Sequence, residues 1–325
     1  MVLNPQLVDP TFYIAAFAGG AFGAAIGALP AFIFTGFMVI AGEALGLAGE
    51  EVVDSGSSIT GLIGFGPVFG PHISFAAGAA AAAYAAKQGY LDDGKNILWA
   101  AGTNRVDVLL VGGIFGILGL VGTGLFRTVG IPTDNIALMV FVSALIHRVV
   151  FGYSIIGEIT GDGMFDVGPW ERDEDEAPGV WLGHQYKWAS VALIGLVGGI
   201  LGGFLFQATG STTLGFGISA ASLLFLHTDT SVPVTHHITL PGSVGALGAA
   251  AAGYSPAVVL IVGGLFGAFG GLMGEICNRI FYMHGKTHVD PPAFGIAASG
   301  FLSAILTAAG VLGSTFWNPI TALGL

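Results

Sequence analysis

Apolar residues along the chain gather in long runs that polar residues interrupt only briefly. Such runs predict helices over about 12–42, 106–128, 136–152, 188–208, 256–277 and 292–313. Two more runs, 59–86 and 213–253, contain Pro and His and predict interrupted helices. Because a helix that spans a bilayer needs about 20 apolar residues, the pattern predicts an all-α, polytopic integral membrane helical bundle with roughly seven to nine membrane segments.

The order of these runs is repeated along the chain. Four glycine clusters share the pattern Gly-Gly-apolar-(Phe/Leu)-Gly and open with Gly19 and Gly20, Gly112 and Gly113, Gly198 and Gly199, and Gly263 and Gly264. Small residues of this kind let membrane helices approach closely, so these glycines are candidates for helix packing. Segments 70–75 and 235–240 are also alike. One membrane domain over 1–325 is expected, with repeated halves at 10–152 and 188–318 joined by an acidic linker loop at 153–187.

The basic residues bear on how the halves are oriented, because short cytoplasmic loops collect Lys and Arg. They gather after the first interrupted helix and between the halves, at Lys87, Lys95, Arg105, Arg148, Arg172 and Lys187. If the interrupted helix crosses completely, both loops lie on one side and the halves are parallel. Arg279 and Lys286 then fall on the opposite side. We therefore expect parallel halves, with inverted halves as the alternative.

Composition excludes several classes of protein. The chain is 54% hydrophobic and 9% charged, with a mean hydropathy of +0.82, whereas soluble domains carry roughly 25% charged residues. Nine Lys and Arg against twenty Asp and Glu leave a net charge of −11, which excludes nucleic acid as a partner and is the balance expected in high salt. The first apolar run lacks the flanks of a cleaved signal peptide. Cys277 is the only cysteine, so no internal disulfide is expected.

The two interruptions are the sequence features that indicate function most specifically. Backbone freed by a break inside a membrane survives only where it is buried in protein or lines a wet cavity, and transporters place solute sites at such breaks. The candidate binding residues are Pro71, His72, Asp229, Thr235, His236 and His237. The competing interpretation is that the breaks are ordinary loops at the membrane edge.

Charged residues near the apolar runs are candidates for coupling or gating. Glu275 lies four residues before Arg279, a helical spacing that permits an ion pair. Such a pair could gate a path or merely close a helix end. Asp107 is a further candidate, although its place at a helix start also suits a carboxylate structurally.

A looser pattern concerns metal binding. His284, His288 and Asp290 have spacings seen among metal ligands. Gly285 and the two prolines after Asp290 argue against a regular helix that would align them, so a solvated loop is the favoured interpretation. No cofactor, metal or catalytic motif is predicted, and the chain is not expected to be an enzyme.

The span from Leu29 to Phe37, the segment from Phe69 to Ile73 and the alanine run after it resemble uncharacterised membrane proteins of salt-loving prokaryotes. The resemblance covers most of the chain. It implies a habitat and a membrane location, and it brings no activity with it.

Two functions are compatible with these patterns. The first is a transporter or channel in the plasma membrane, multi-pass, that binds an ion or small polar solute between the two interrupted helices. The second is a non-catalytic assembly protein whose glycine-rich helix faces pack subunits into a homo-oligomer. Lipid is the common partner in both.

Overall fold

The computed structural model describes residues 4–48, 59–98, 100–102, 104–159, 161–173, 179–228 and 230–317. These residues form helices and no strand, apart from an isolated bridge between Gly94 and Thr287. The all-α prediction is therefore confirmed over the described ranges.

The first half contains α1 (Pro10–Ile26), α2 (Ala28–Leu47), α3 (Ala76–Lys87), α4 (Val106–Val129) and α5 (Asn135–Val150), with the short turns η1 (Pro5–Leu7), η2 (Ile59–Gly64) and η3 (Pro71–Phe75). The helix expected over 12–42 is instead two helices. Gly27 separates them with a φ of 97°, a conformation that side chains other than glycine rarely adopt. Pro30 then falls in the first turn of α2, where a missing N–H costs nothing.

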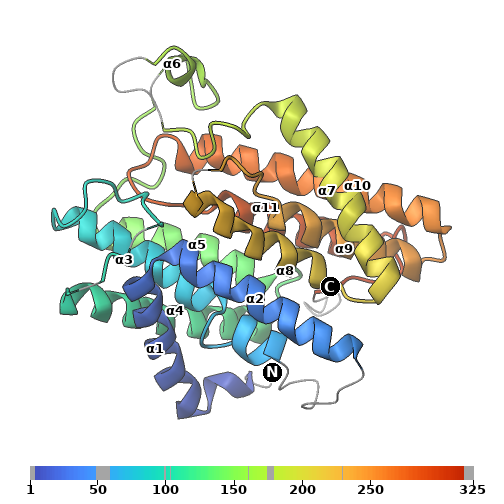
Figure 1. Cartoon of the computed structure of the whole chain (residues 1–325), viewed down its shortest axis with the longest axis horizontal. Coiled ribbons are helices and arrows are strands. Elements are labelled where there is room, and N and C mark those ends of the chain that lie inside the picture. Colours follow the sequence, from blue (N-terminus) through green and yellow to red (C-terminus); the bar gives the residue numbers. More distant parts are fainter. Residues whose placement is uncertain are drawn as a thin grey trace.

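The second half contains α7 (Trp188–Thr209), α8 (Leu214–Ala221) with η4 (Ser222–Thr228), α9 (His236–Ala251), α10 (Pro256–Cys277) with η5 (Asn278–Tyr282), and α11 (Pro291–Ala308). Between the halves, the linker carries α6 (Gly168–Glu171), which projects from one edge of the molecule (Figure 1). Figure 1 shows α1 to α5 on one side of the bundle and α7, α9 and α10 on the other.

Five helical segments are long and apolar enough to span a membrane: α2, α4, α7, Pro256–Tyr282 and α11. Shorter apolar helices add α1, α5 and Leu214–Thr228. Large apolar side chains such as Ile114, Leu193 and Leu265 are about 60% exposed on the outer surface. Apolar surface of this extent suits contact with lipid and agrees with a membrane protein.

Matching glycine contacts hold the long helices of each half together. In the first half, Gly20 of α1 faces Gly116 of α4 so closely that a methyl group on Gly20 would lie 2.8 Å from the Gly116 Cα. In the second half, a methyl group on Gly199 of α7 would lie 2.9 Å from the Cα of Gly267 in α10. Each pair therefore packs backbone against backbone.

The interrupted segments occupy matching places against these helix pairs. The backbone of Ser74 lies against Gly23, and that of Thr239 lies against Gly202. The first interrupted segment runs antiparallel to α2. Thr60 lies against Gly42 near the end of α2, and Gly78 lies against Ala28 at its start. Between them, the carbonyl of Phe69 accepts a hydrogen bond from Thr35. The break at 65–70 therefore falls midway along this helix pair.

The two halves meet through antiparallel helices. In the pair α2 and α8, Gly36 lies against Ala220, and the later residue Val39 lies against the earlier residue Gly217, so the two helices run in opposite directions. In α5 and α11, Thr133 donates to the carbonyl of Ala297, and further along the rings of Phe141 and Phe294 are 5.2 Å apart. Both pairs of helices therefore run antiparallel to each other.

Candidate functional site

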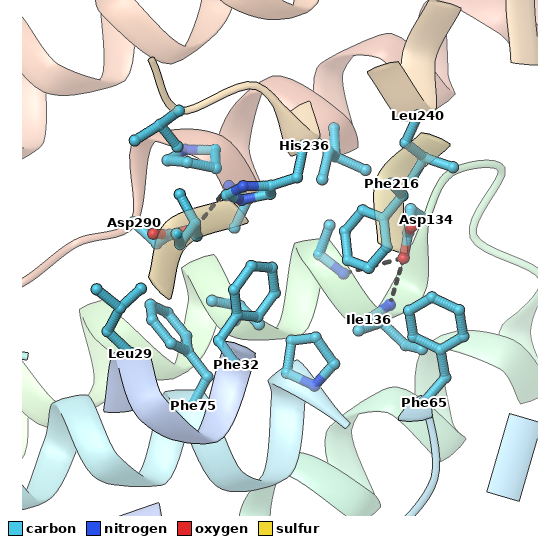
Figure 2. A pocket seen from close by; sticks show the side chains of 18 of the residues that line it. Leu29, Phe32, Phe65, Phe75, Asp134, Ile136, Phe216, His236, Leu240 and Asp290 are labelled. Carbon is cyan, nitrogen blue, oxygen red and sulfur yellow. Dashed lines mark hydrogen bonds between the residues drawn. The ribbon is translucent and has the colours of Figure 1, made fainter. Parts of the chain in front are cut away.

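A cavity of about 1310 Å³ lies where the halves meet. Its walls come from α2, η3, α5, α8, α9 and α11, and Figure 2 shows its central part. The middle of the wall is apolar and largely aromatic, with Leu29, Phe32, Phe65, Phe75, Phe216, Leu240 and Ile296. Most of these side chains are buried and belong to the packed core of both halves.

Each interrupted segment contributes one residue of the predicted site to this wall. Pro71 opens η3 and His236 opens α9, and the two hold equivalent positions in the aligned segments 70–75 and 235–240. The other described candidates do not line the cavity. His237 lies against Gly274 and Trp181, and the His72 ring lies beside Gly70.

The remaining two candidates at the second break have other positions. Thr235 caps α9 with its backbone carbonyl, which accepts from the N–H groups of Ile238 and Thr239. Asp229 lies outside the described residues.

His236 is the polar group in the apolar middle of the wall. Its ring lies 4.7 Å from that of Phe32 and 5.8 Å edge-on to that of Phe216. The residue is 4% exposed, and its Nδ1 has no hydrogen-bond partner among the described residues. An unpaired buried nitrogen costs about 1–3 kcal/mol. His236 therefore places an unpaired polar atom in the layer of side chains around the cavity (Figure 2), as does His288.

A carboxylate stands at either end of the region in Figure 2. Asp134 caps α5 by accepting from the backbone N–H groups of Ile136 and Ala137, at 2.9 and 3.0 Å. Asp290 caps α11 by accepting from Ala293 N at 2.8 Å, and its other oxygen lies 3.2 Å from His288 Nε2. Both line the cavity. Caps of this kind fix the carboxylates in place.

Two cations also line the cavity. The Lys95 ammonium donates to the carbonyl of Met283 at 3.1 Å and lies 4.6 Å from the centre of the Tyr282 ring. Burial lowers the pKa of Lys95 to about 8, against a partial opposing effect of Asp93. Arg127 donates to the Gln6 side chain at 3.5 Å. Both cations therefore already have partners in the protein.

The coupling candidates lie away from this wall. Glu275 and Arg279 form the buried ion pair that their spacing permits, at 2.7 Å. Arg279 also donates to the carbonyls of Phe165 and Tyr186, at 2.6 and 3.2 Å, so the pair ties the linker to α10. Asp107 accepts from the Tyr84 hydroxyl at 3.3 Å in the first turn of α4.

The metal candidates are separated in the structure. His284 Nε2 lies 3.1 Å from the carbonyl of Met164, whereas His288 faces Asp290. No group of three His, Cys, Asp or Glu that could hold a metal ion occurs among the described residues. His284 and His288 with Asp290 are therefore not a ligand set in this conformation.

Sequence reasoning missed Asp134 and the aromatic wall. The signal for Asp134 was present, since Pro132 and Thr133 precede it and an apolar run follows, the pattern of a helix N-cap. No such signal distinguishes Phe32, Phe75 and Phe216 from phenylalanines that face lipid. Their role follows only from the way the halves meet.

No curated protein and no protein of known structure shows significant similarity to the chain. One family profile matches it, over residues 2–321. The match spans nearly the whole chain, both interrupted segments and the cavity wall included. The chain therefore belongs to DUF7973, a family of unknown function.

Proposed function

We propose that the protein is a multi-pass transporter or channel of the plasma membrane that moves an ion or small polar solute through the central cavity. The observation that carries the proposal is the convergence of both interrupted segments, through Pro71 and His236, on one cavity between the halves. Solute sites of secondary transporters lie at such repeat interfaces, at breaks in the helices.

The antiparallel contacts of α2 with α8 and of α5 with α11 support an inverted repeat. Each half then contributes five membrane-embedded segments: α1, α2, 59–87, α4 and α5, and their counterparts α7, α8 with η4, α9, α10 and α11. An odd number in each half is what inversion requires. This proposed count is higher than the expected seven to nine because Gly27 divides one expected span, and because η4 ends at Thr228 and α9 begins only at His236 within another.

The loops that carry most basic residues lie together at one edge, which we assign to the cytoplasm. Lys95 contacts the carbonyl of Met283, Gly94 lies against Lys286, and the Lys87 ammonium lies near Gly152. Arg279 and Lys286 therefore share this edge with Lys87 and Lys95, rather than facing the opposite side as expected from the sequence.

The alternative function, assembly through glycine faces, has less support. A methyl group on Gly113 would meet the Phe17 ring, and one on Gly264 would meet Leu196 and Ile200. These glycines are already packed within one chain. A homo-oligomer, if it forms, would have to use other surfaces.

Cysteine accessibility tests whether the cavity is a solute path. In a Cys277→Ala background, Ala137→Cys and Ala293→Cys each place one thiol in the cavity wall, and Leu265→Cys places one on the outer surface. We expect membrane-impermeant thiol reagents to label the cavity thiols in sealed vesicles and to spare Leu265→Cys. A cavity that no reagent reaches from either side of the membrane would refute the proposal.

A further inference from the structure

The middle of the cavity is built from rings, not from oxygen ligands. Phe32, Phe75 and Phe216 surround it together with the imidazole of His236. An alkali or alkaline-earth ion needs several oxygen ligands to replace its water. The volume of about 1310 Å³ also leaves room for an organic molecule, since sites for drug-sized molecules typically measure roughly 300–1,000 Å³. The cavity is therefore matched to an organic molecule.

The charge of the lining indicates the sign of that molecule. Among the described lining residues, four carboxylates (Glu43, Asp93, Asp134 and Asp290) outnumber two cations (Lys95 and Arg127). Each cation already has partners in the protein: Lys95 lies by carbonyl and ring groups and near Asp93, and Arg127 lies by Gln6 and near Asp134. An anion would meet an excess of like charge, whereas a cation would find complementary carboxylates at both ends.

Aromatic faces attract cations as well as apolar groups, because the ring quadrupole places negative charge on the face. Phe32 and Phe216 lie edge-to-face at 5.8 Å, so their rings present differently oriented surfaces to one space. Such walls suit a bulky cation whose charge is surrounded by apolar groups.

We propose that the solute is a lipophilic organic cation, held by the aromatic wall of the cavity and by the charges of Asp134 and Asp290. The proposal rests on the proposed function and narrows its solute to one chemical class. The imidazole of His236 lies beside these rings and carries an unpaired nitrogen. An uncharged molecule with the same rings would lack the contribution of the two carboxylates.

The test measures binding of tetraphenylphosphonium to detergent-purified full-length protein, with neutral triphenylphosphine oxide as the matched probe. A ligand that binds the folded protein raises its Tm. We expect tetraphenylphosphonium to raise the Tm of the wild type and the neutral probe to have little effect. The double variant Asp134→Asn/Asp290→Asn should bind about tenfold more weakly, and asparagine preserves both helix caps.

Two further variants separate the contributions. Phe216→Leu should weaken binding of tetraphenylphosphonium, whereas Phe204→Leu, on the outer surface of α7, should leave it unchanged. Equal stabilisation by the neutral probe, or full binding to the double variant, would overturn the inference. If tetraphenylphosphonium fails to bind while the cavity cysteines remain accessible, the organic-cation inference fails and the transport proposal stands.

Discussion

At the scale of single residues, the glycine contacts set the spacing of the helices. Gly199 and Gly46 make a matched pair, because both are helical but only Gly199 meets backbone, while nothing lies within 4 Å of a methyl group on Gly46. We expect Gly199→Ala to destabilise the protein by about 1–3 kcal/mol through overpacking. Gly46→Ala should be neutral or slightly stabilising. Thermal unfolding in detergent measures both, and equal Tm values would show that α7 can move away from α10.

Lys95 gives the molecule a pH dependence in the alkaline range. Its pKa is about 8 in the folded protein against an ordinary 10.5, so between these values the unfolded chain holds a proton that the folded chain lacks. Stability from this group therefore rises with pH from 8 to 10.5. The Tm of the wild type minus the Tm of Lys95→Met should therefore increase as the pH rises through this window.

The control for this titration is Lys187→Met, which removes an exposed lysine. The difference in Tm between the wild type and Lys187→Met over the same window gives the baseline for this comparison. A difference for Lys95→Met that does not change beyond this baseline would mean that its ammonium remains fully solvated.

The structure distinguishes which of the candidate histidines can contribute to solute binding. From the sequence, His72, His236 and His237 are all candidate binding residues. In the structure His72 and His237 lie outside the cavity wall whereas His236 lines it, so we expect His237→Ala to lower the Tm and His236→Ala to weaken solute binding. Tm and tetraphenylphosphonium binding of the two single variants distinguish these effects. Normal binding to His236→Ala would remove His236 from the site.

At the scale of elements, the ion pair of α10 anchors the linker. Removing one partner of a buried pair costs about 3–5 kcal/mol because the other charge is left unpaired. Glu275→Gln should therefore lower the Tm and expose the linker to protease, and Glu275→Gln/Arg279→Met should recover part of the loss. If Glu275→Gln instead changes solute flux with the Tm unchanged, the pair is a gate, as the alternative interpretation of its spacing has it.

The sequence predicted single helices better than their interruptions. The expected ranges 106–128, 188–208 and 256–277 agree with α4, α7 and α10 to within a residue, because long apolar runs between polar ends leave few alternatives. The sequence did not predict that Gly27 divides one helix into two, because a single glycine within a run of small residues is equally typical of a helix-packing site. The cavity could not be predicted, because its walls come from elements far apart along the chain.

At the scale of the whole molecule, the proposed inverted repeat predicts that one half moves against the other during transport. A cross-link between Phe141→Cys and Phe294→Cys joins α5 to α11 across the halves, at side chains whose rings are 5.2 Å apart. In the Cys277→Ala background we expect a short bifunctional thiol reagent to abolish flux through this pair while binding persists.

The matched control joins Phe281→Cys to Phe294→Cys, which lie 6.4 Å apart within the second half. This cross-link should leave flux intact. Full flux through the cross-linked Phe141 and Phe294 pair would indicate a channel that opens without relative motion of the halves.

The equivalent positions of Pro71 and His236 have an evolutionary consequence. Two identical chains related by a symmetry axis could present only a pair of prolines or a pair of histidines at this place. A single chain that carries both halves can present one of each. In the proposed transporter, one chain with two halves can therefore place a rigid proline on one side of the cavity and an imidazole on the other.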